Sequence, residues 1–337
     1  MITLESLLTT LCTCPGISGD ESAAAQQALQ ILNDYCTDAH ISHGNVIGTF
    51  GSTDENAPHI LLDAHIDQVG LIVTSVTDDG FLTVGNVGGL DRRLLPVQKV
   101  SVCGKKIIRG IVCTLPPHLT NGNEKVQKIE EVRIDTGYDA QELRELVQPG
   151  DSVYFDLFAE KLPGGYFAAS ALDDRCGIAA ILYALDLLKN EQIPCRVTVQ
   201  FSTEEEVGER GACIGCFAAD PDIALAVDVS FAGDGKRSET GVMGKGAMIG
   251  VSPSLSYDIS LALQSAADHE QIPWQYEVMN GTTGTNADRF SVCREGVKAC
   301  TVSIPLRYMH TPAEVIDLND VENTGKLIAA YLRRCGA

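Results

Sequence analysis

The chain has 337 residues, with 45 aspartates and glutamates against 25 lysines and arginines, so its formal net charge is −20. A surface this acidic repels nucleic acid and anionic membranes, which excludes both as partners. The length favours two domains, and no apolar segment of the sequence reaches the roughly 20 residues that a membrane-spanning helix needs.

Twelve cysteines are scattered along the chain without a secretion signal, because residues 1–14 contain no lysine or arginine. We therefore expect reduced thiols and a cytoplasmic protein. Cys213 and Cys216 form one C-x-x-C pair. A second pair at matching spacing is absent from the sequence, so the pair indicates small residues in a helix rather than a zinc ribbon.

The N-terminal part of the chain combines helix and strand patterns. We predict helices at residues 4–11 and 22–35, separated by the turn-rich residues 15–19, with Asp20 as the N-cap of the second helix. The apolar residues 59–65 then predict a buried strand.

Residues 71–164 show a different pattern of short β-type runs separated by Gly, Pro, Asn and Asp. This pattern predicts a small β-barrel or sandwich. The predicted strands are residues 71–76, 81–84, 99–103, 107–113, 130–135 and 152–155.

From about residue 165, helix and strand patterns alternate again, which predicts a mixed sheet covered by helices on both faces. Residues 1–70 and 165–337 would form this α/β domain, and residues 71–164 would be inserted into it. The predicted helices are 175–188, 211–219, 257–270, 287–293 and 321–334, and the predicted strands are 196–202, 223–229, 275–279 and 297–304.

The first segment that could carry chemistry is Asp63-Ala64-His65-Ile66-Asp67. Residues two apart in a strand share a face, so His65 and Asp67 point the same way. A metal-binding imidazole needs a partner that fixes its orientation, and Asp67 could be that partner. Taken alone, His65 fits equally well as a histidine that ends a buried strand.

Four further candidates lie near predicted strand ends. Each has an ordinary structural alternative: Asp173 fits a helix cap, for example, and Glu204-Glu205-Glu206 fits a solvated cluster. Their joint placement is more informative, because α/β folds bind ligands at strand ends. Together with His65 they match a site for two divalent ions with a bridging carboxylate. The four candidates are Asp173, Glu206, Asp228 and His310.

These segments together resemble the family 42 metallopeptidases, the tetrahedral or glutamyl aminopeptidase family, whose members are often labelled cellulase or endoglucanase. The resemblance covers nearly the whole chain. The matching segments are Pro15 to Gly19, Asp63 to Gly70, Pro116 to Leu119, Leu172 to Arg175, Glu205 to Ala212, Asp228-Val229 with Ala232-Gly233-Asp234, and Arg307 to Pro312.

The resemblance implies a ligand role for each candidate. Asp173 would bridge two ions, His65 and Asp228 would complete the ligands of one, and Glu206 and His310 those of the other. The ions would be zinc, with cobalt or manganese as alternatives, since all three accept mixed His and carboxylate ligands.

The resemblance also implies that Glu205 is the general base and acid, that Asp67 orients His65, and that a cis peptide follows Asp173. The fold would be a zinc-peptidase-like catalytic domain with an inserted PDZ-like barrel. The barrel would serve assembly into a homo-oligomer, often a hollow tetrahedral dodecamer.

Two positions depart from the family pattern. Gln68 lies where the family usually has Glu, and Asn286 lies where it usually has Asp. Neither position is a ligand in that pattern, so the departures bear on substrate preference or metal affinity rather than on the presence of a site.

The expected activity is removal of the first residue from peptides with a free N-terminus. One alternative is a metal-dependent deacylase, which the ligand set alone does not exclude. A glycoside hydrolase needs two carboxyl groups and usually no metal, so it leaves both histidines unused. A catalytically inactive shell is the third alternative, and the intact ligand set argues against it.

Overall fold

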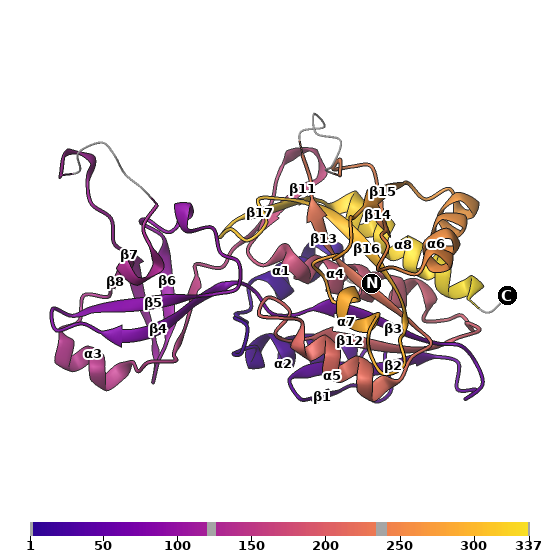
Figure 1. Cartoon of the computed structure of the whole chain (residues 1–337), viewed down its shortest axis with the longest axis horizontal. Helices are drawn as coiled ribbons and strands as arrows, with labels where there is room; N and C mark the ends of the chain where they lie inside the picture. Colours follow the sequence, from indigo (N-terminus) through magenta and orange to yellow (C-terminus); the bar gives the residue numbers. More distant parts are fainter. Residues whose placement is uncertain (1–2, 120–125, 234–240, 336–337) are drawn as a thin grey trace.

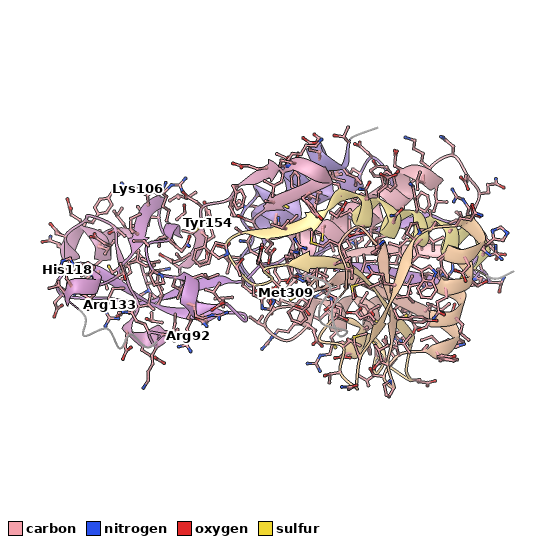
Figure 2. The ribbon with its side chains drawn as sticks, turned by 90° about the horizontal axis from the view of Figure 1, so that it is seen from above. Arg92, Lys106, His118, Arg133, Tyr154 and Met309 are labelled. Atoms are coloured by element: carbon pink, nitrogen blue, oxygen red, sulfur yellow. The ribbon has the colours of Figure 1, made fainter. Side chains whose placement is uncertain are left out.

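The computed structural model describes residues 3–119, 126–233 and 241–335. An α/β body carries a separate closed barrel, which extends away from it (Figures 1 and 2). The fold therefore confirms the predicted mixed α/β sheet with a small β-barrel inserted in it.

An 11-stranded mixed sheet forms the centre of the larger body, in the order β1-β2-β12-β3-β13-β16-β17-β11-β10. Strand β14 pairs with β16, and β15 pairs with β14. Strands β12, β3, β13 and β16 are parallel neighbours, so their carboxyl ends meet at one edge. The bounds are β1 (His40–Ser42), β2 (Asn45–Gly51), β3 (His59–His65), β10 (Ala159–Lys161), β11 (Tyr166–Ala169), β12 (Arg196–Ser202), β13 (Ile223–Phe231), β14 (Ala247–Val251), β15 (Trp274–Val278), β16 (Lys298–Arg307) and β17 (Glu314–Asp317).

Helices cover both faces of this sheet. Helices α4 and α8 pack on each other and on β3, β13 and β16, while α5 and α7 pack on the opposite face (Figure 1). Helix α4 is buried on nearly every side, which explains why its sequence is apolar all round. The bounds are α1 (Leu4–Cys12), α2 (Ser22–Leu32), α4 (Leu172–Leu188), α5 (Arg210–Ala219), α6 (Tyr257–Glu270), α7 (Ala287–Phe290) and α8 (Leu318–Arg334).

The barrel closes in the order β4-β5-β8-β7-β6-β9 and has its own apolar core. Strand β7 alternates exposed and buried residues along its length, as a barrel wall requires. The bounds are β4 (Gly70–Val76), β5 (Phe81–Val87), β6 (Lys99–Cys103), β7 (Ile107–Val112), β8 (Arg133–Asp135) and β9 (Ser152–Phe155), with helix α3 (Ala140–Leu146) on the outside.

The predicted N-cap of the second helix is wrong. Helix α2 begins at Ser22 with Glu21 at its N-cap position, so Asp20 does not cap it. The carboxylate of Asp20 instead accepts a hydrogen bond from the Ser152 hydroxyl of β9, which joins the N-terminal turn to the barrel. The side chain of Asp20 therefore makes a tertiary contact instead of the local helix cap that the sequence pattern predicted.

The twelve cysteines form no disulfide, and Cys213 and Cys216 lie in α5. Within the described residues, no helix has the length and apolar character needed to cross a membrane. Residue Asp234 of the matching segment Ala232-Gly233-Asp234 lies outside the described residues.

Candidate metal centre

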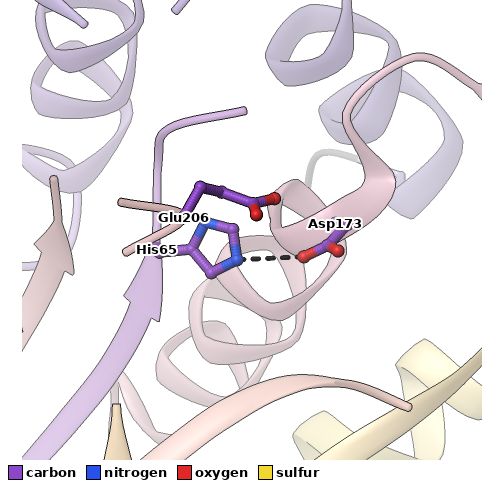
Figure 3. Close-up of side chains that lie close together, drawn as sticks. All are labelled: His65, Asp173 and Glu206. Carbon is purple, nitrogen blue, oxygen red and sulfur yellow. Dashed lines mark hydrogen bonds and ion pairs between the residues drawn. The ribbon is translucent and has the colours of Figure 1, made fainter. Parts of the chain in front are cut away.

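His65 is the last residue of β3, a strand that is buried along its whole length. Its ring lies between two acidic segments. Nε2 is 2.9 Å from Oδ1 of Asp173, and Nδ1 is 3.1 Å from the backbone oxygen of Asp67. Figure 3 shows His65 facing Asp173, with Glu206 on the same side of the ring. Burial lowers the pKa of His65, but the hydrogen bonds to Asp173 and Asp67 outweigh it and raise that pKa well above its usual value.

Asp173 and Asp174 lie where β11 passes into α4, and the peptide between them is cis, as the resemblance implied. Neither has helical backbone angles, although both fall within the bounds of α4. Asp174 accepts hydrogen bonds from the backbone N–H groups of His65 (3.2 Å) and Gly177 (3.1 Å), so it is the residue that holds the helix start. Asp173 is thereby left to face the pocket.

The glutamate run follows β12. The carboxylate of Asp67 accepts hydrogen bonds from the backbone N–H groups of Glu205 (3.0 Å) and Glu206 (3.2 Å) and from the hydroxyl of Ser18 (2.6 Å). These bonds fix the backbone of the run, while Oδ1 of Asp67 is 3.5 Å from Nδ1 of His65. Asp67 therefore positions the two glutamates at least as firmly as it positions His65.

Asp228 and His310 complete the group. Asp228 lies inside β13, three residues before its end, because the strand runs on to Phe231. His310 follows β16, and its Nε2 is 3.4 Å from Oδ2 of Asp173 and 3.3 Å from Oε2 of Glu206. The two oxygens of Asp173 thus face two different histidines.

Sequence reasoning missed Glu314. This buried residue accepts hydrogen bonds from the backbone N–H groups of Asp173 (3.0 Å) and His310 (2.9 Å), and so ties together segments that are distant in sequence. Its only local signal is a position four residues after His310, at the start of the short strand β17.

The predicted residues line one pocket of about 450 Å³, except Asp67, which lies behind it. Two overlapping groups have ligand atoms within 4.8 Å of one another, namely His65, Asp173 and Glu206, and His65, Asp174 and Asp228. The second group contains Asp174, which the resemblance did not assign as a ligand.

Several carboxylates lie close together in the pocket. Burial raises the pKa of Glu205 to about 9, with nearby His65 opposing the rise and Asp228 and Glu206 adding to it. Burial and the charge of Asp173 likewise raise the pKa of Asp228 to about 7. Two histidines do not balance this many acids, whereas divalent cations would, and oxygen and imidazole ligands suit them. The donor set therefore fits a divalent metal site.

The two departures from the family pattern lie at the edge of this group. Asn286 is buried, and its amide donates to Oδ2 of Asp63 (2.6 Å) and to the hydroxyl of Ser202 (2.9 Å). An aspartate at this position would place a second carboxylate against that of Asp63. The amide of Asn286 can instead donate a hydrogen bond to Asp63. Gln68 is buried, and its side-chain oxygen has no hydrogen-bond partner among the described residues.

Comparison with known proteins supports a hydrolase of the aminopeptidase class. The chain belongs to the M42 glutamyl aminopeptidase family, whose model matches residues 44–327. It is 33% identical over 336 residues to the lysyl aminopeptidase of Pyrococcus furiosus, with 97% of this chain and 96% of that protein covered.

Solved structures of similar proteins support the same family assignment. An aminopeptidase from the archaeon Desulfurococcus kamchatkensis is 31% identical, with a TM-score of 0.91 and coverage of 98% of this chain and 94% of that one. The TET1 peptidase of Pyrococcus horikoshii, described as assembling into a tetrahedron or a large octahedral shell, is 31% identical, with a TM-score of 0.88 and coverage of 98% and 100%.

Proposed function

We propose that the chain is a cytoplasmic two-metal aminopeptidase that removes the first residue from peptides. The observation that carries the proposal is the position of Glu205, whose Oε2 is 3.9 Å from Nε2 of His65 in a pocket that also contains both groups of ligand atoms. A carboxylate beside the ligands, but outside both groups, is free for proton transfer.

Asp173 is the proposed bridge between the ions, because its two oxygens face His65 and His310 separately. His65 and Asp228 would complete one ion's ligands, and Glu206 and His310 the other's. Zinc fits this mixed set, and cobalt or manganese are alternatives. When bound, two such ions would polarise the scissile carbonyl and lower the pKa of a water molecule.

The chain's own residues supply the proton transfers. Glu205 would take the proton of the attacking water and later deliver it to the leaving amine. Asp67 would hold the backbone of Glu205 and Glu206 in register through its two carboxylate oxygens. The acidic pocket would hold the substrate's free amino group, which limits cleavage to the first residue.

We further propose that residues 1–70 and 165–337 form the catalytic domain, and that the inserted domain, residues 71–164, serves homo-oligomer assembly. The last strand of the proposed insertion, β10 (Ala159–Lys161), pairs with β11 of the larger sheet. The assembly of the P. horikoshii TET1 peptidase into a tetrahedron or a large octahedral shell supports homo-oligomer formation by similarity. A tetrahedral dodecamer is the form of assembly proposed.

The test compares leucine p-nitroanilide with its N-acetylated form, before and after chelation and zinc restoration. Aminopeptidase function predicts hydrolysis of the free form only, with loss and recovery of activity. Preference for the acetylated form would instead make the chain a deacylase. Chelator-insensitive hydrolysis of a cellulosic substrate would make it a glycosidase.

A further inference from the structure

The pocket contains one carboxylate that the proposed mechanism does not use. Glu277, on β15, lines the same pocket as Asp228 and Glu205. Strand β15 pairs only with β14, at the side of the sheet. Glu277 therefore enters the pocket from a side strand, whereas four of the proposed ligands come from the central strands or the segments that follow them. These four are His65, Glu206, Asp228 and His310.

The strand register explains how Glu277 reaches the pocket. It pairs with Gly250 of β14, which has no side chain, and its Oε2 accepts a hydrogen bond of 2.6 Å from the hydroxyl of Ser303 on β16. Ser303 pairs in turn with Asp228 on β13. The Glu277 carboxylate is thus held beside the proposed metal centre, separated from Asp228 by a serine.

No described lysine or arginine forms an ion pair with Glu277. Among the described lining residues, one other carboxylate lies outside the proposed metal and proton-transfer groups. This residue, Glu209, has an ionic partner, because Nε of Arg289 lies 2.8 Å from its Oε2. Burial raises the pKa of Glu277, and the hydroxyls of Ser230 and Ser303 oppose that rise. A carboxylate in such surroundings is stabilised by a cationic partner.

The pocket supplies no such partner from its described lining, which contains no lysine or arginine. The lining does contain apolar side chains, including Phe231 and Met309. A substrate side chain with an aliphatic stem and a terminal cation matches this combination. An acidic substrate side chain would face repulsion from every carboxylate of the pocket.

We propose that Glu277 determines specificity by selecting peptides whose first residue is lysine or arginine. The proposal rests on the proposed aminopeptidase function and names its substrate class. The α-amino group is common to every free peptide, so a contact between Glu277 and that group would affect all substrates equally. Selection of a basic first residue would instead make the effect of Glu277 depend on the first side chain.

The experiment measures kcat/KM for the p-nitroanilides of lysine, arginine, leucine and glutamate with the zinc-loaded full-length protein. The proteins are the wild type, Glu277→Gln, Glu277→Asp and the exposed surface control Glu270→Gln, each checked for metal content and melting temperature. The wild type should prefer lysine and arginine over leucine, and glutamate should be the poorest substrate.

Glu277→Gln should lower kcat/KM for lysine and arginine by about 10- to 100-fold, the range for a charge-assisted hydrogen bond, and change that for leucine by less than about 3-fold. Glu277→Asp should restore part of the loss, and Glu270→Gln should match the wild type. Equal losses on lysine and leucine, or a wild-type preference for leucine or glutamate, would overturn the proposal. Hydrolysis of none of the substrates would overturn the aminopeptidase function as well.

Discussion

Glu205 and Glu206 are adjacent residues with different proposed tasks, and their surroundings separate them. Oε2 of Glu206 lies 3.3 Å from Nε2 of His310 and belongs to a ligand group, whereas Glu205 lies outside both groups. Burial raises the pKa of both carboxyl groups, so their positions rather than their pKa values separate them. The sequence supplied only the run of three acids. The resemblance assigned the roles, and the hydrogen bonds from the two backbone N–H groups to Asp67 give the physical reason for the arrangement.

Substitution Glu205→Gln keeps the size of the side chain but removes its ability to accept a proton. We expect kcat to fall by about 10²- to 10⁴-fold, the usual contribution of general acid–base catalysis, with metal content unchanged. Steady-state kinetics and elemental analysis measure the two quantities. The matched control is Glu204→Gln, because Glu204 is half-exposed and only 3.7 Å from exposed Arg210. Comparable kcat values for both variants would refute the assignment of Glu205.

Some site residues carry little sequence signal. Glu314 is buried and joins the backbones of Asp173 and His310, yet the sequence around it resembles any short polar turn. The sequence offered Asp173 as a helix cap, and only the backbone geometry shows that Asp174, rather than Asp173, accepts the helix N–H. Such roles depend on contacts between segments more than 100 residues apart along the chain.

At the scale of elements, the long apolar helices and central strands were predictable because burial imposes a clear period on them. Three elements that the sequence did not predict have weak apolar patterns of their own. Strand β2 contains two glycines and forms through pairing with β1 and β12, and the short strand β17 is defined by its neighbours β11 and β16. Helix α3 has one buried residue, Leu143, so its sequence shows almost no apolar face.

Arg175 joins several elements and lies fully buried in α4. Its guanidinium donates to the backbone oxygens of Ile66 (2.7 Å), Leu11 (2.6 Å) and Cys14 (3.2 Å). Substitution Arg175→Met would leave these buried carbonyls unpaired and should lower the free energy of unfolding by about 3 kcal/mol or more.

Urea unfolding in the presence of chelator measures this loss without a contribution from bound metal. The control is Arg210→Met, which removes an exposed arginine and should cost less than about 0.5 kcal/mol. An equally small loss for Arg175→Met would show that the buried hydrogen bonds contribute little.

Helix α8 contains a carboxylate away from the metal centre that makes stability depend on pH. Asp320 accepts backbone hydrogen bonds from Gly244 (2.6 Å) and Gly246 (2.7 Å), yet burial raises its pKa from 3.8 to about 6. The folded chain therefore holds this proton more tightly than the unfolded chain. The resulting stability is fully present below about pH 4 and is lost as the pH rises toward about 6.

Substitution Asp320→Asn removes the titrating group. The free energy of unfolding of the wild type minus that of Asp320→Asn should fall by up to about 3 kcal/mol between pH 4 and pH 7. Urea unfolding at several pH values, with chelator throughout, measures this difference. A difference that stays constant with pH, or that rises, would contradict the assigned shift.

At the scale of the whole molecule, the barrel has an apolar outer surface that a single chain leaves uncovered. Val97, Ile107 and Ile111 have exposed fractions of 65%, 60% and 43%. Ile107 and Ile111 lie on the same face of β7, since residues four apart in a strand point the same way. Exposed apolar groups of this kind are typical of interfaces between chains.

We expect the double substitution Ile107→Lys, Ile111→Lys to reduce the mass of the assembly in solution, because it places two charges on the proposed interface. Light scattering coupled to gel filtration measures that mass. Hydrolysis of aminoacyl p-nitroanilides should persist, since the substitutions are remote from the pocket. Glu55→Lys, an exposed change on the α/β body, is the control. An unchanged mass would exclude this face of the barrel from assembly.

The central claim is that one chain binds two catalytic metal ions. The most direct test is the number of zinc ions bound per chain when the metal-free protein is titrated to full aminopeptidase activity. The proposed ligand sets around Asp173 predict two ions per chain, with full activity only after the second has bound. Full activity with one ion per chain, or with none, would contradict the account.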